Sequence, residues 1–196
     1  MTKEPLPLAT IQGAVFKFLQ NRDDVVVFGA QAVNVYVGEP RMTQDIDLMS
    51  VRAAILVEEL RDYLSQRFYI AVRVREVKAG QGYRLYQAQK SGNRHLVDVR
   101  QVEDLPSAQR IEQVLVMSPT ALIASKVISF HQRRGKPKSG TDWRDLAMLL
   151  LAFPELKRES GEVLEDLSAA GASEPILALW REVVAMEIES EEEDDW

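Results

Sequence analysis

Two aspartates separated by a single residue, Asp45 and Asp47, are the first residues of this sequence whose spacing can support chemistry. Successive side chains of a β-strand point to opposite faces, so these two carboxylates would share one face, roughly 7 Å apart along the strand. Ile46 and Leu48 would then face a core. Carboxylates held in this way can bind Mg²⁺, so the spacing predicts metal-assisted chemistry.

A glycine turn lies upstream of this pair. The run Val25–Phe28 predicts a buried strand that ends at Gly29, and residues 31–37 predict a short helix. The free N–H groups at the start of that helix would face an incoming phosphate. The Gly29-Ala30 turn lacks the further glycines of a dinucleotide-binding fingerprint. Turn and carboxylates together favour chemistry on a nucleoside triphosphate.

Helical and strand periodicities alternate in the segments that would position these residues. Apolar residues at helical spacing predict helices over residues 9–20 and 52–67. A period of two predicts a strand meander over residues 70–74, 83–86 and 96–99. After Pro106 the pattern predicts helices, over residues 118–134, 141–151, 155–169 and 174–188. The expected fold class is therefore α+β, with a mixed β-sheet and flanking helices followed by an all-helical C-terminal part.

The composition indicates a globular chain with segregated charge. The 196 residues are 46% hydrophobic and include no cysteine, so we expect a sizeable core without disulfides or thiolate sites. The net charge is −6, and without the seven acidic residues between Glu187 and Asp195 it becomes +1. The basic residues Arg133, Arg134, Lys136, Lys138 and Arg144 gather in one segment that could meet a nucleotide or an RNA. No signal segment or membrane span is evident, so we expect a cytoplasmic protein without a membrane partner.

The order of the motifs resembles the nucleotidyltransferase superfamily, and especially its small prokaryotic branch that contains the AbiEii-type toxins. The resemblance starts with the strand, the Gly29-Ala30 turn, the short helix and Pro40-Arg41-x-Thr43-x-Asp45-x-Asp47. It continues with a third acidic strand, His95-Leu96-Val97-Asp98-Val99, and then with two helices, Ser118-Pro119-x-x-Leu122-x-x-x-Lys126 and Asp142-x-x-Asp145-Leu146. In all it covers roughly residues 25 to 150. Two positions depart from the family pattern: Ala30 stands where serine or glycine is usual, and Thr141 stands where a basic residue is usual.

The resemblance implies a role for each of these residues. Metal ligands, for two Mg²⁺ ions, would be Asp45, Asp47 and Asp98. Contacts to the nucleotide would come from Gly29, Ala30, Arg41, Thr43 and Lys126. Catalytic roles would fall to Asp45, Asp47, Asp98, Lys126 and Asp145. The implied domains are a nucleotidyltransferase core over residues 1–104, a helical domain over residues 105–188 and an acidic disordered tail over residues 189–196.

Other interpretations of these residues stay open at this stage. Asp45, Asp47 and Asp98 could be solvated strand positions, and Lys126 could be a surface lysine whose stem covers apolar neighbours. Asp142 could simply cap a helix, whereas Asp145 could organise Lys126 or the base of the nucleotide. His95 and His131 each lack a cysteine or histidine partner, so we expect no zinc site and predict that both are structural.

The resemblance implies an enzyme that transfers a nucleoside monophosphate from an NTP to an acceptor hydroxyl. For an AbiEii-type toxin the acceptor would be an RNA such as a tRNA end, and the functional partner would be an antitoxin. Small molecules or protein hydroxyls are alternative acceptors. A binding module that keeps the fold without turnover is a further alternative, and Ala30 is the main reason to consider it.

Overall fold

The structure is a computed structural model that describes residues 6–77, 79–90 and 92–189. The chain divides into two compact units. The first comprises the described residues up to Ala32 together with Arg41–Met117, and the second comprises Val33–Pro40 together with the described residues from Ser118 onward. Residues 190–196 of the predicted acidic tail lie outside the described residues. No helix in the described ranges is both long and apolar enough to cross a membrane.

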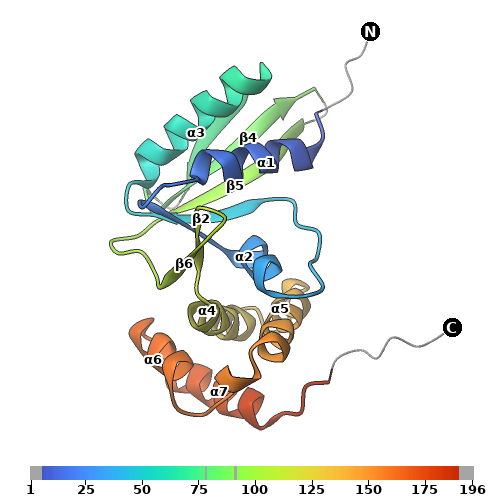
Figure 1. Cartoon of the computed structure of the whole chain (residues 1–196), viewed down its shortest axis with the longest axis vertical. Helices are drawn as coiled ribbons and strands as arrows, with labels where there is room; N and C mark the ends of the chain where they lie inside the picture. Colours follow the sequence, from blue (N-terminus) through green and yellow to red (C-terminus); the bar gives the residue numbers. More distant parts are fainter. Residues whose placement is uncertain (1–5, 78, 91, 190–196) are drawn as a thin grey trace, which may run out of the picture. The chain divides into compact units, whose positions relative to one another are not determined.

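Within the described residues, the first unit is built on a seven-stranded mixed sheet with the strand order β3-β4-β5-β2-β1-β7-β6 (Figure 1). The strands are β1 (Val25–Phe28), β2 (Ile46–Ser50), β3 (Val72–Val77), β4 (Gly82–Gln89), β5 (Gly92–Gln101), β6 (Ala108–Ile111) and β7 (Val114–Met117). Two neighbouring pairs, β2 with β5 and β1 with β7, are parallel, and the other pairs are antiparallel. The central strands β1 and β2 therefore lie between the meander β3–β5 and the hairpin β6–β7.

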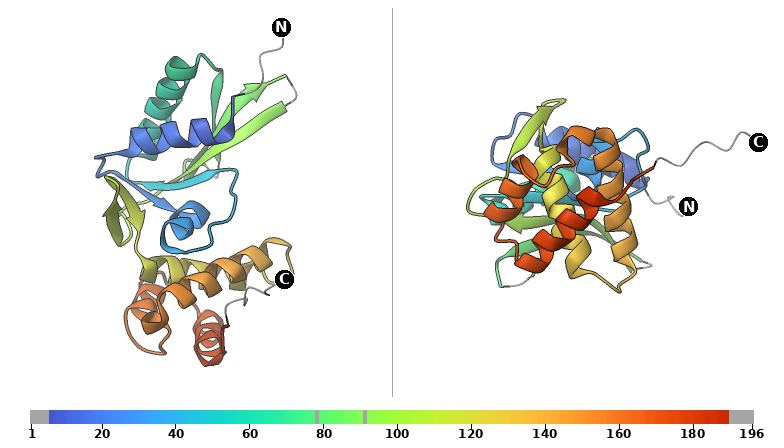
Figure 2. Two further views of the ribbon diagram at one scale, coloured as in Figure 1. Left: turned by 45° about the vertical axis from the view of Figure 1, so that its right-hand side comes forward. Right: turned by 90° about the horizontal axis from the view of Figure 1, so that it is seen from below.

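Two helices of the first unit cover one face of this sheet (Figure 2). Helix α3 (Ala53–Phe68) contacts β3, β4, β5 and β2, and helix α1 (Leu8–Leu19) contacts α3 and β7. The leucines Leu56, Leu60 and Leu64 recur at helical spacing on α3 and are fully buried. Because strand residues alternate between faces, burial of this face leaves the intervening residues of β2 and β5 on the opposite face.

Helices make up the second unit from Ser118 onward. They are α4 (Pro119–Gln132), α5 (Lys138–Ala152), the short 3₁₀ helix η1 (Pro154–Leu156), α6 (Glu162–Ala169) and α7 (Glu174–Ala185). The Ser118 hydroxyl accepts a hydrogen bond from the Ala121 amide, which confirms the predicted cap with Pro119 at the first helical position. Helix α4 contacts α5, α6 and α7 and so forms the centre of this unit. Trp180 of α7 is fully buried, and its Nε1 donates to the carbonyl of Arg158.

The structure confirms the mixed sheet with flanking helices. The helix predicted over residues 155–169 is shorter, because α6 begins at Glu162 and residues 157–161 between it and η1 are not helical. A second correction concerns the segment directly after Pro106. The prediction of purely helical structure there is wrong for residues 108–117, which form β6 and β7. Each of these strands has four residues, too few for a clear period of two, and β7 is held by parallel pairing of Val116 with Val27 of β1. That partner is distant in sequence, so local periodicity gives no sign of it. The short helix α2 (Gly29–Tyr36) also begins at the glycine itself rather than two residues later.

Candidate active site

Parallel pairing of β2 and β5 places Asp47 directly opposite Asp98. Their side chains therefore lie on the same face of the sheet. On β2 the flanking residues Ile46 and Leu48 are fully buried on the other face, as the sequence pattern predicts. Asp45 lies in a bend immediately before β2 and is partly exposed, like Asp47 and Asp98. The sheet thus places Asp47 beside Asp98, from segments about fifty residues apart, and Asp45 lies in the bend directly before β2.

Gly29 allows the end of β1 to approach Asp47 closely. Its φ of +70° lies in the left-handed region, which side chains rarely adopt. A Cβ atom at this position would lie 2.9 Å from Cγ and 3.0 Å from Cβ of Asp47. Since Phe28 pairs with Asp47 across β1 and β2, the glycine turn and the carboxylate are fixed by the same register. Glycine is therefore required here both for backbone conformation and for space.

A β-bulge brings His95 to the carboxylates. The register of β4 and β5 shifts between Leu85 and Tyr86, so that Leu85 pairs with Val97 and Tyr86 pairs with His95. Leu96 is consequently buried next to Val97 instead of lying on the face of Asp98, where regular alternation would place it. His95 was predicted to be structural because it has no cysteine or histidine partner in the sequence, and that criterion does not consider carboxylate partners. An apolar pair, Leu96-Val97, in an otherwise alternating strand is the one local signal of this bulge.

His95 bridges two of the three carboxylates. Its Nδ1 lies 3.3 Å from Oδ2 of Asp45, and its Nε2 lies 3.1 Å from Oδ1 of Asp98. These two hydrogen bonds, to Asp45 first and then to Asp98, raise the pKa of His95 to about 10 despite partial burial. The imidazole is therefore protonated at neutral pH and partly neutralises the two aspartates.

A divalent cation suits the same cluster. One ligand atom from each of Asp45, His95 and Asp98 can be chosen so that all three atoms lie within 4.8 Å of one another. The carboxylate oxygens are the ligands that Mg²⁺ prefers. The imidazolium shows that this position already accommodates positive charge.

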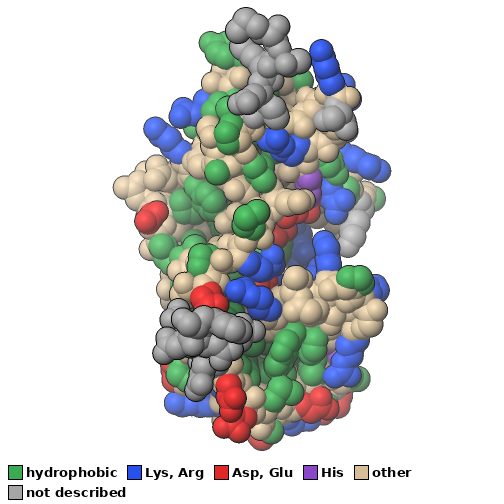
Figure 3. Space-filling view, turned by 90° about the vertical axis from the view of Figure 1, so that its right-hand side faces the viewer, with side chains coloured by type: hydrophobic (Ala, Val, Ile, Leu, Met, Phe, Trp, Pro, Cys, Tyr) green, Lys and Arg blue, Asp and Glu red, His purple; other side chains and the backbone are tan. Residues whose placement is uncertain are grey.

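Arginines surround the carboxylates on the same face of the sheet. The Nε of Arg84 lies 2.9 Å from Oδ1 of Asp98, and the guanidinium of Arg100 stacks 5.0 Å from the centre of the Phe28 ring. Both arginines, together with Asp47 and Asp98, line a hollow of about 130 Å³. In the space-filling view, basic side chains lie beside acidic ones on the face that is displayed (Figure 3). Carboxylates for a cation and arginines for phosphate thus occur in one place.

The loop before β2 is ordered by Thr43. Its hydroxyl donates to the carbonyl of Asp45 at 2.7 Å, and its own carbonyl accepts from Nε2 of Gln12 at 3.1 Å. In this structure Thr43 therefore positions Asp45, and its predicted contact with the nucleotide stays a prediction. Arg41 begins the same loop and is partly exposed.

Lys126 and Asp145 form a buried ion pair within the second unit. The Nζ of Lys126 on α4 lies 2.7 Å from Oδ2 of Asp145 and 3.7 Å from Oδ1 of Asp142, both on α5. Asp142 also accepts from Nη1 of Arg133 at 2.8 Å. The expectation that Asp145 organises Lys126 agrees with this geometry. The geometry disagrees with the two alternatives, a surface position for Lys126 and a capping role for Asp142. Lys126 is only 7% exposed, and α5 begins at Lys138, ahead of Asp142.

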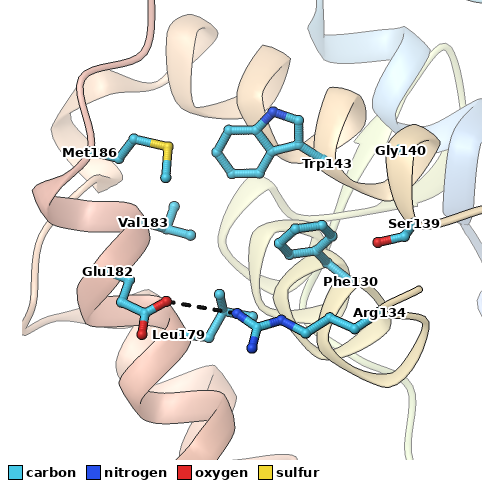
Figure 4. A pocket seen from close by; sticks show the side chains of 9 residues that line it. All are labelled: Phe130, Arg134, Ser139, Gly140, Trp143, Leu179, Glu182, Val183 and Met186. Atoms are coloured by element: carbon cyan, nitrogen blue, oxygen red, sulfur yellow. Dashed lines mark ion pairs between the residues drawn. The ribbon is translucent and has the colours of Figure 1, made fainter. Parts of the chain in front are cut away.

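A second hollow, of about 520 Å³, lies among the helices of the second unit (Figure 4). Its walls are mostly apolar and include Phe130, Trp143, Leu179, Val183 and Met186. The acidic residue Glu182 at its rim pairs with Arg134 at 3.7 Å. This hollow is larger than the one beside Asp47, but it offers no carboxylate cluster for a metal.

A comparison with protein-family models decides the family. The model described as "Nucleotidyl transferase AbiEii toxin, Type IV TA system" matches residues 14–196. The chain belongs to this AbiEii family of nucleotidyltransferases. A comparison with curated proteins found no match.

Solved structures agree with this assignment at the level of the fold. Megavirus polyadenylate synthase is similar with a TM-score of 0.62 and 14% identity over 75% of this AbiEii-family chain, which spans 32% of that protein. An antigenic nucleotidyltransferase-like protein from Paracoccidioides brasiliensis is similar with a TM-score of 0.51 and 21% identity, over 95% of this chain and 97% of that one. The antibiotic-resistance factor ANT(2'')-Ia is similar with a TM-score of 0.50 and 15% identity, over 91% and 96%. The identities are low, so these similarities show the nucleotidyltransferase fold and leave the acceptor open.

Proposed function

We propose that this enzyme transfers a nucleoside monophosphate from an NTP to a hydroxyl of RNA, such as a tRNA end, with Mg²⁺ bound by Asp45, Asp47 and Asp98. The observation that carries the proposal is the pairing of Asp47 with Asp98 across β2 and β5, beside Asp45 and the Gly29 turn. Membership of a toxin family supports RNA as the acceptor and an antitoxin as the functional partner. Such a toxin would act in the cytoplasm, where NTPs and RNA are available.

The proposed mechanism consists mainly of positioning and charge neutralisation. Bound Mg²⁺ would neutralise the phosphates and lower the pKa of the acceptor hydroxyl. Gly29 and Ala30 present backbone N–H groups at the start of α2, which favours a phosphate at this turn. Arg41 and Thr43 are proposed to contact the nucleotide from the loop before β2.

Asp98 has a second proposed role as the acceptor of the hydroxyl proton. Its Oδ1 is held by two cationic groups, Nε of Arg84 at 2.9 Å and Nε2 of His95 at 3.1 Å. For Asp98 to bind metal or take a proton through Oδ1, at least one of these contacts must give way. We propose that His95 withdraws when metal binds, because a protonated imidazole and a divalent cation would compete for the same oxygens of Asp45 and Asp98 and repel each other.

Lys126 and Asp145 are proposed to serve the nucleotide from the second unit. A lysine that is 7% exposed and paired with a carboxylate at 2.7 Å is held in one conformation. The resemblance to AbiEii-type proteins supports a contact between Lys126 and the triphosphate, with Asp145 as the residue that positions Lys126.

The test follows the label from an NTP that carries radioactive phosphorus at the α position. Total tRNA, the protein itself and an aminoglycoside are offered as acceptors with Mg²⁺. The wild type is compared with Asp47→Asn and with the control Asp62→Asn, an exposed aspartate on α3. Label on tRNA that is lost in Asp47→Asn but kept in the control is the expected result.

The other outcomes each contradict part of the proposal. Label on the protein or on the aminoglycoside would replace RNA as the acceptor. Label that is insensitive to Asp47→Asn would remove that carboxylate from the mechanism. No transfer to any acceptor, together with no Mg²⁺-dependent NTP binding, would favour the binding module without turnover.

A further inference from the structure

Four arginines lie on the face of the sheet that carries the catalytic carboxylates. Arg75 of β3 pairs with Arg84 of β4, Arg84 pairs with Asp98 of β5, and Asp98 pairs with Asp47 of β2. Residues paired directly across neighbouring strands share a face, so this row crosses four strands on one side of the sheet. Arg73 lies two residues before Arg75, and Arg100 lies two residues after Asp98, so both belong to the same face.

Arg73 and Arg75, on the edge strand β3, form a patch of positive charge without carboxylate partners among the described residues. Arg73 and Arg75 are exposed, and among the described residues neither has a carboxylate partner within 4.0 Å. Direct opposition of Arg75 and Arg84 places like charges against each other, which destabilises a strand pair. An anion bound across β3 and β4 would relieve that repulsion.

The basic segment of the second unit is different. Arg133 pairs with Asp142 at 2.8 Å and Arg134 pairs with Glu182 at 3.7 Å. Nη2 of Arg144 donates to the carbonyl of Glu39 at 3.2 Å. Three of the five basic residues that the sequence singled out are therefore engaged within their own unit, whereas Arg73 and Arg75 on β3 face solvent.

Distance separates the donor nucleotide from these strand arginines. Neighbouring strands lie about 4.8 Å apart, so the backbone of β3 is about 14 Å from that of β2 and Asp47. A triphosphate held at the carboxylates is next to Arg84 and Arg100, which line the hollow there. An anion that also reaches Arg73 and Arg75 must extend over about 14 Å across the strands, which suits the successive phosphates of an RNA strand.

We propose that Arg73 and Arg75 bind the phosphate backbone of the RNA acceptor and guide its end across β4 toward Asp98 and Asp47. This inference rests on the proposed function and assigns the acceptor site to the β3–β5 face of the sheet. Tyr86, which pairs with Arg73 and whose ring centre lies 5.1 Å from that of His95, is an aromatic side chain of this face that can stack with a base.

The test is direct RNA binding, which requires no turnover. Polarisation of fluorescently labelled total tRNA is measured against salt concentration for the wild type, for Arg73→Gln/Arg75→Gln and for a control with the same charge change. The control is Arg61→Gln/Arg67→Gln on α3, which covers the opposite face of the sheet. Loss of two phosphate contacts should weaken binding roughly tenfold at moderate salt and lower the slope of log affinity against log salt by about 1.4. The control should bind like the wild type, and thermal unfolding should show that both variants fold.

Two results would overturn the inference. Equal affinity and salt slope for Arg73→Gln/Arg75→Gln and the wild type would exclude this face from RNA binding. A raised KM for the NTP with unchanged RNA affinity would assign the arginines to the donor nucleotide. Failure of the proposed function would give a different result: the wild type would transfer label to none of the acceptors, whatever its RNA affinity.

Discussion

Replacement of Gly29 by alanine should be among the most damaging single-methyl changes in this protein. The left-handed φ of +70° costs alanine about 1–2 kcal/mol. The new Cβ would lie 2.9 Å from Cγ and 3.0 Å from Cβ of Asp47, well inside van der Waals contact. Relief by rotation of Asp47 away from its rotamer adds about 0.5–1.5 kcal/mol. The free energy of unfolding should therefore fall by about 1.5–3.5 kcal/mol.

The structure offers a control that separates backbone strain from the clash. Gly171 has a nearly identical φ of +69°, and a Cβ at that position would meet nothing within 4 Å. Gly171→Ala should therefore show the strain alone. Urea unfolding of both variants measures the difference, which should be about 1 kcal/mol. Transfer of nucleotide should fall in Gly29→Ala, because Asp47 is displaced, and should be retained in Gly171→Ala.

A double-mutant cycle tests whether contact with Asp47 causes the destabilisation of Gly29→Ala. In an Asp47→Ala background the carboxylate carbon is absent, so Gly29→Ala should cost less than it does in the wild type. The reasoning is refuted if Gly29→Ala is no more destabilising than Gly171→Ala. It is also refuted if Gly29→Ala costs the same with and without Asp47→Ala.

Three further predictions concern charge and hydrogen bonding at the site. The pKa of His95 is raised to about 10, so its contribution to the stability of the metal-free protein is complete below pH 6.5 and is lost as the pH rises toward 10. Urea unfolding across this pH range should show the loss of stability. In His95→Gln this pH dependence should be absent. Lys126→Met should destabilise the protein by about 3–5 kcal/mol because it removes the ammonium group that pairs with the buried Asp145. Lys126→Met/Asp145→Leu should recover part of that loss, and equal unfolding midpoints for the single and double variants would contradict this. Ala30→Ser should tighten NTP binding about fivefold in isothermal titration, because the hydroxyl adds one hydrogen bond to phosphate, and thermal stability should be unchanged. Unchanged affinity would show that the turn does not contact the nucleotide through this side chain.

The sequence alone determined the local elements and most of the residue types at the site. The alternation around Asp45 and Asp47 predicted correctly that Ile46 and Leu48 are buried, because a period of two is a property of the strand itself. The Gly29 turn, the Ser118 cap and the helices from residue 119 onward also follow from local patterns. Each of these features depends on residues that are close together in the chain.

Features that depend on pairing between distant segments were decided by the tertiary structure. Residues 108–117 became strands because β7 pairs with β1, and the opposition of Asp47 and Asp98 depends on the β2–β5 register. His95 joined the carboxylates because a bulge in β5 turned Leu96 into the core. Strand periodicity predicts which way a side chain points only until one residue is inserted, after which every later prediction reverses. The carboxylates were therefore predictable from the sequence. The position of His95 between Asp45 and Asp98, and that of the arginines on the same face, depended on the paired sheet.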